Sequence, residues 1–91
     1  MKRIDYYGRS FTVSDTYAGA LVDYVNRRVA NNLPFGEFFP MRCYAADPKT
    51  VIEVTVQLVA GVPVLVYPAD AAFDGIEEIV DDAVALARLA G

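Results

Sequence analysis

The sequence predicts an α+β fold: a two-layer structure in which an antiparallel sheet of about five strands carries two helices on one face, in the order ββαβββα. Residues 51–59 alternate apolar and polar side chains, which is typical of a half-buried strand. Residues 15–31 and 76–90 instead repeat apolar side chains every three or four positions, which is typical of amphipathic helices. With 91 residues, the chain is predicted to form one small domain over residues 1–91.

The first predicted unit is a β-hairpin over residues 2–13. If Tyr7 and Gly8 form its loop, Ile4 lies opposite Phe11. The polar side chains expected to face outward are Arg3, Asp5, Ser10 and Thr12.

The first helix is predicted over residues 15–31, with Ser14 or Asp15 as its cap and Pro34 beyond its end. Its buried stripe is expected to consist of Ala18, Leu21, Val22, Val25 and Val29. Tyr17, Tyr24 and Arg28 are placed on the flank of that stripe.

Three further strands are predicted over residues 38–46, 51–59 and 62–67, joined by loops at Pro48-Lys49 and Ala60-Gly61. These loops pair Ala46 with Val51, Ala45 with Ile52, Cys43 with Val54, Met41 with Val56, Phe39 with Leu58, Leu58 with Pro63, Val56 with Leu65 and Val54 with Tyr67. The side chains expected to face the helices are Phe39, Met41, Cys43, Ala45, Ile52, Val54, Val56, Leu58, Leu65 and Tyr67. The opposite, outer face is expected to carry Phe38, Pro40, Arg42, Tyr44, Glu53, Thr55, Gln57, Val59, Val62, Val64 and Val66.

This outer face is richer in apolar side chains than a sheet surface in contact with water. A large exposed apolar patch usually marks a contact surface. The predicted interface consists of Phe38, Arg42, Tyr44, Val62, Val64 and Val66.

The last predicted helix begins at an N-cap, Asp74, and carries four carboxylates in its first half: Glu77, Glu78, Asp81 and Asp82. Three interpretations apply: a solvated helix start that matches the helix dipole, a site for a hard metal ion, or an acidic patch that docks a basic partner. The residues lack the calcium-loop pattern, and we expect no metal.

The composition excludes several kinds of chemistry. The chain has no histidine and one cysteine, which excludes catalytic arrangements and metal sites that need histidine. Cys43 is expected to be a buried structural thiol opposite Val54 rather than a nucleophile. We therefore expect no catalytic residues, no cofactor and no enzymatic activity.

The net charge of −4 disfavours nucleic acid as a partner. No apolar run is long enough for a membrane span, the amino terminus does not resemble a signal peptide, and the lone cysteine suits the cytoplasm.

The leading functional hypothesis is a non-enzymatic interaction or regulatory module that binds another protein, first of all itself, through the apolar outer face. The second is a small acidic inhibitor or adaptor that docks a basic partner through the start of the last helix. The third is a ligand-binding domain or enzyme with a pocket lined by Asp5, Tyr17 and Tyr24.

Overall fold

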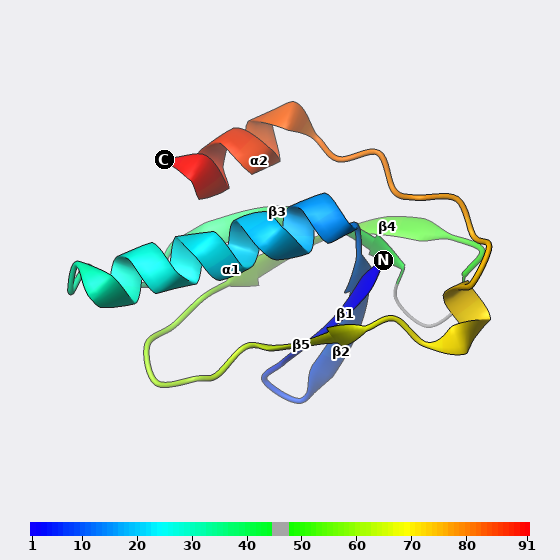
Figure 1. The fold of residues 1–91 in the computed structure, drawn as a ribbon. Coiled ribbons are helices and arrows are strands. Elements are labelled where there is room, and N and C mark those ends of the chain that lie inside the picture. The colour runs from blue at the N-terminus through cyan, green and yellow to red at the C-terminus, as the bar shows by residue number, and fades with distance from the viewer. Residues whose placement is uncertain (45–47) are drawn as a thin grey trace.

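The computed structural model describes residues 1–44 and 48–91 and shows an α+β fold with a five-stranded antiparallel sheet, as predicted (Figure 1). In chain order, the elements are β1 (Lys2–Tyr6), β2 (Arg9–Val13), α1 (Asp15–Ala30), β3 (Phe38–Tyr44), β4 (Val51–Gln57), β5 (Leu65–Pro68), a short 3₁₀ helix η1 (Ala71–Phe73) and α2 (Ala83–Ala90). The strands lie side by side in the order β4-β3-β2-β1-β5.

The β1–β2 hairpin has the predicted register, with Ile4 opposite Phe11. Tyr7 and Gly8 both have positive φ angles, 51° and 75°, as a two-residue type I′ turn requires. Thr12 lies opposite Arg3, on the face predicted for it, but it is buried, where it pairs with Tyr44 of β3.

Helix α1 begins where predicted, since the Ser14 hydroxyl caps it by accepting a hydrogen bond from the Tyr17 backbone N–H at 2.9 Å. Its buried face differs from the prediction. Tyr17, Ala18, Leu21 and Tyr24 are buried, whereas Val22 and Val29 are exposed. Two tyrosine rings bury more apolar area than two valines, and the ring of Tyr24 packs edge-on against Phe39 with centroids 4.9 Å apart.

Strands β3 and β4 pair two residues out of step with the prediction: Cys43 lies opposite Ile52 rather than Val54, and Phe39 lies opposite Val56. The connection between Tyr44 and Val51 is longer than the predicted loop, which accounts for the shift. A slip of two leaves every side chain on its predicted face, because strand faces alternate with a period of two. The expected placement of Ala45, Ala46 and Asp47 in a strand and turn lies outside the described residues.

Among the described residues, strands β2 and β3 pair between Thr12 and Tyr44. Strand β2 ends at Val13 and α1 begins at Asp15, so β2 does not extend along the first part of β3. Two carbonyls of that part of β3 accept hydrogen bonds from the helices. Tyr17 Oη donates to the Pro40 carbonyl at 3.2 Å, and Arg88 Nη2 donates to the Phe38 carbonyl at 2.8 Å. Helix α2 thus contacts the part of β3 that β2 does not reach.

Strand β5 pairs with β1, with Ile4 opposite Val66, so the predicted pairing of strand five with strand four is wrong. The chain after β4 does not fold straight back. Leu58 is buried, and the Val59 N–H donates to the hydroxyl of Tyr6 at 2.8 Å. This hydrogen bond places the chain after β4 next to β1. The new pairing reverses the faces of this strand: Val66 shares the face of the buried Ile4, while Leu65 shares the face of Asp5.

Helix α2 is shorter than predicted, because it begins at Ala83 with Asp82 as its N-cap, and residues 74–82 are not helical. Side chains of this segment make hydrogen bonds to the start of α1. In a helix that started at Asp74, the same side chains would point in other directions. Glu78 Oε1 accepts from the Asp15 N–H at 3.0 Å, and Asp81 Oδ2 accepts from the Ser14 hydroxyl at 2.5 Å. Figure 1 shows the segment running in extended form from η1 to α2.

Candidate interaction surface

An open groove lies between the β1–β2 hairpin and β4, with a volume of about 980 Å³. We call it the hairpin–β4 groove. Its apolar lining consists of Phe11, Ile52, Val54, Val56 and Val59, together with the tyrosines Tyr6 and Tyr7. Its polar lining consists of Arg9, Ser10, Thr55 and Gln57. The hairpin supplies one wall of the groove, from Tyr6 to Phe11, and β4 and the residues after it supply the other.

The hairpin–β4 groove is mostly uncharged. Among the described residues of its lining, Arg9 is the one that carries a charge, and Ile52 and Val59 are each 38 % exposed. Tyr7, at the hairpin turn, is 79 % exposed. Apolar side chains in contact with water next to an exposed aromatic ring are typical of a surface that another molecule covers.

Of the three predicted interface residues of β3, two are covered by other parts of the chain. Tyr44 is buried: its ring lies 5.5 Å from that of Phe73, and its hydroxyl donates to the Glu77 carbonyl at 3.4 Å. Arg42 is half-buried and donates from Nη1 to the Val80 carbonyl at 2.9 Å. Only Phe38 is exposed among the three. The segment that the prediction placed in a helix covers the other two.

The three predicted interface residues near β5 lie on the helix side of the sheet. Val62 and Val64 pack against the core, and Val64 and Val66 line a hollow beside Leu21 of α1. Their assignment to the outer face is therefore wrong, because it depended on pairing with β4. The outward side chains of β5 include Tyr67, whose ring lies 5.4 Å from the guanidinium of Arg3.

Three of the four carboxylates predicted to form an acidic patch make separate contacts within the chain. Glu78 and Asp81 bind the start of α1, and Asp82 Oδ1 accepts from the Val84 N–H at 2.9 Å to cap α2. The side chain of Glu77 is exposed. Among the described side chains, Asp81 Oδ1 is the one buried polar atom without a hydrogen-bond partner.

Cys43 is fully buried, as predicted, although its neighbour across the ladder is Ile52. Burial raises the pKa of its thiol from 9.0 to about 11. A buried thiol that stays protonated at neutral pH is a poor nucleophile.

The structure does not bring Asp5, Tyr17 and Tyr24 together. Asp5 accepts hydrogen bonds from Arg3 Nε at 2.9 Å and from the Ser10 hydroxyl at 2.6 Å, whereas both tyrosines are buried in the core. Burial, followed by the negative charge of Asp81, raises the pKa of Tyr17 to about 12.

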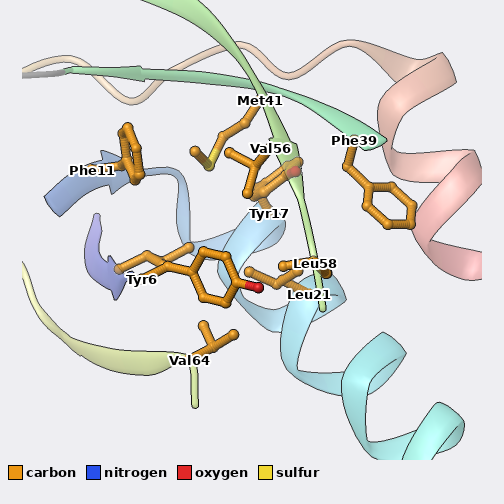
Figure 2. A pocket seen from close by; sticks show the side chains of 10 residues that line it. Tyr6, Phe11, Tyr17, Leu21, Phe39, Met41, Val56, Leu58 and Val64 are labelled. Carbon is orange, nitrogen blue, oxygen red and sulfur yellow. The ribbon is translucent and has the colours of Figure 1, made fainter. Parts of the chain in front are cut away.

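The core holds a cavity of about 20 Å³ that is walled by apolar and aromatic side chains from β1, β2, β3, β4 and α1 (Figure 2). In Figure 2 the side chains of Tyr6, Phe11, Met41 and Val56 converge on this space. The volume is close to that of one water molecule, and the lining is apolar. Within residues 1–44 and 48–91, no cluster of three or more Cys, Asp or Glu side chains could hold a metal ion.

The residues of the hairpin–β4 groove were missed as a surface because the alternation in 51–59 predicts a face covered by helices. The alternation itself carries no signal for the groove, because it is the same whether helices cover that face of the strand or leave it open.

Among the helices of the described residues, none has the length and apolar character needed to cross a membrane. Comparisons of the chain with protein-family models, with curated proteins and with solved structures found no match.

Proposed function

We propose that this chain is a non-catalytic protein-interaction module that associates with itself through the hairpin–β4 groove and the adjoining strand β4. The observation that carries the proposal is the groove itself, in which Ile52 and Val59 expose apolar side chains beside the half-buried Phe11, Val54 and Val56. Covering these side chains removes apolar area from water, at roughly 25 cal/mol for each Å².

The shape and chemistry of the groove favour a protein as its occupant. A broad, open surface formed by a strand and a hairpin offers little enclosure to a small molecule. Its rim carries Tyr7, Thr55 and Gln57, which offer an aromatic ring and polar groups around an apolar centre. With one positive charge in the lining and a net charge of −4 for the chain, the surface does not suit nucleic acid.

The reactive side chains support a non-catalytic role. Cys43 is buried with a raised pKa, and Asp5 is engaged by Arg3 and Ser10. The buried free thiol is also the reason for proposing the cytoplasm, a reducing compartment, as the location.

Sedimentation velocity at 1 to 100 µM tests the proposal. We expect the wild-type chain to change from monomer to dimer in this range, and Ile52→Lys to weaken association at least tenfold by placing a charge in the groove. The matched control is Leu65→Lys, at an exposed leucine on the outer face of β5 at the opposite edge of the sheet, which should associate like the wild type. A wild-type chain that stays monomeric throughout the range refutes the proposal.

A further inference from the structure

We infer that the self-association joins the β4 strands of two copies, antiparallel and centred on Val54, so that two five-stranded sheets become one continuous sheet. The inference rests on the proposed function and specifies its partner as a second copy of this chain. It follows from the direction in which each backbone group of the two edge strands points.

Strand β4 has an open edge whose backbone groups can be assigned. The Leu58 N–H donates to the Glu37 carbonyl at 3.3 Å, and this contact continues the register in which Phe39 lies opposite Val56. Hydrogen-bonded pairs alternate along an antiparallel ladder, so Ile52, Val54 and Val56 direct their backbone groups to β3. The groups of Val51, Glu53, Thr55 and Gln57 therefore point away from the sheet.

The other edge strand, β5, is protected. The Ala69 N–H donates to the Met1 carbonyl at 3.3 Å, and in this register the outward backbone groups of β5 belong to Val66 and Pro68. Proline has no N–H, so within Leu65–Pro68 only Val66 presents a donor. Residues 51–57 contain no proline or lysine, which commonly blunt an exposed edge, and Glu53 is their one charged residue. Of the two edges, β4 is thus the one able to accept another strand.

The sequence of β4 suits a two-fold copy of itself. With Val54 at the centre, Glu53 lies opposite Thr55 of the second copy, and Val51 lies opposite its Gln57. Every outward-pointing residue then meets another outward-pointing residue, and all of 51–57 is paired. Centring on Glu53 instead places two carboxylates directly opposite each other, which is destabilising. A register in which outward-pointing residues meet inward-pointing ones forms no ladder.

The same register matches the apolar side chains. Ile52 lies opposite Val56 of the second copy, and the two Val54 side chains meet at the two-fold axis. These are non-hydrogen-bonded pairs, in which antiparallel Cα atoms approach to about 4.5 Å and side chains contact closely. All three residues line the hairpin–β4 groove, so the apolar linings of the two grooves become continuous.

Disulfide formation between introduced cysteines tests this register. Because Cys43 lies opposite Ile52, all variants also carry Cys43→Ala, which leaves the introduced cysteine as the one thiol of the chain. Val54→Cys should form a disulfide-linked dimer in air at least tenfold faster than Leu65→Cys, the control on the protected strand. Ile52→Cys and Val56→Cys should each crosslink slowly alone and at least tenfold faster when mixed, with mass spectrometry identifying the mixed dimer. Equal rates for the separate and mixed variants overturn the inference.

Thr55→Pro gives a second test, because it removes an outward N–H that β3 does not use. We expect a folded monomer by circular dichroism and sedimentation. Suppose that the wild type dimerises, that Thr55→Pro also dimerises, and that the cysteines do not crosslink in the predicted pairs. In that case the edge pairing is wrong, while the proposed self-association stands. If the wild type is monomeric, both the edge pairing and the proposed self-association are wrong, and the partner of β4 would be an extended segment of another protein.

Discussion

The hydroxyl of Ser14 donates to Asp81 Oδ2 at 2.5 Å and at the same time accepts from the Tyr17 backbone N–H at 2.9 Å. One side chain therefore caps α1 and holds the 74–82 segment against it. Ser14 is 1 % exposed, and Asp81 Oδ1 is buried beside this contact. The Ser14 oxygen thus joins the start of α1 to the 74–82 segment, next to the hydrogen bond from the Asp15 N–H to Glu78.

Replacing Ser14 by alanine removes both hydrogen bonds. Loss of an N-cap costs about 1 kcal/mol, and a buried carboxylate oxygen left without its donor adds about 1–3 kcal/mol. We expect Ser14→Ala to lower the free energy of unfolding by roughly 2–4 kcal/mol in urea titrations. Thr16→Ala, at an exposed position in the first turn of the same helix, is the control and should change stability little. A loss below about 0.5 kcal/mol for Ser14→Ala contradicts the assigned role.

Arg88 should anchor α2 to β3. Its guanidinium donates to the Phe38 carbonyl and lies 5.4 Å from the centroid of the Phe39 ring. Arg88→Met keeps an apolar stem over the ring but removes the donor and the charge. We expect a loss of about 1 kcal/mol and faster hydrogen exchange of the α2 amides, with the α1 amides as the internal reference. Exchange that accelerates equally in both helices indicates general destabilisation instead.

Cys43 should make stability depend on alkaline pH. Its pKa is about 11 in the folded chain against an ordinary value of 9.0, so above pH 9 the unfolded chain loses its thiol proton first. The resulting stability is fully present below pH 9 and is lost as pH rises to 11, by about 2–3 kcal/mol. Urea titrations at pH 8 to 11 should show a shallower decline for Cys43→Ala. A residual decline is expected, because the pKa of Tyr17 is also raised, to about 12. Identical slopes in the two proteins rule out the contribution of Cys43.

Asp5 should titrate below its ordinary pKa of 3.8, first because Arg3 donates a hydrogen bond to it and second because Ser10 does. Its contribution to stability is present above pH 3.8 and is lost as pH falls through the lowered pKa. Carbon-13 NMR of the carboxyl group gives the midpoint directly. Arg3→Gln should move that midpoint upward, and a midpoint that does not move shows that Arg3 is not the cause.

Sequence periodicity was sufficient for the fold class, the first hairpin and the start of α1. These are local features: the register Ile4–Phe11 follows from a two-residue loop, and Ser14 caps the helix that directly follows it. The faces of β3 and β4 were also predicted correctly, because the error in their register was an even number of residues.

The features that could not be predicted depend on contacts between distant parts of the chain. Residues 65–68 pair with β1 rather than β4, and the Val59 N–H, which donates to the hydroxyl of Tyr6, holds the preceding chain beside β1. Whether residues 76–82 form a helix is decided by what Glu78 and Asp81 can bind, namely the start of α1. Neither partner is visible from local spacing. As a result, the residues of the predicted contact surface lie in three different environments, and the groove was not predicted.

The pairing of β1 with β5 has a consequence for how the chain is made. Lys2 is synthesised well before its partner Pro68, because the rest of the hairpin, α1, β3 and β4 lie between them in the chain. Throughout that interval β1 has a free side. Closing so long a loop is the entropically most demanding pairing of the sheet, so it should follow the local hairpins in time. A chain that stops before Leu65 keeps β1 bare as well as β4. Such a product has two open sheet edges instead of one. We therefore expect chains that end before Leu65 to aggregate more readily than chains that extend through β5.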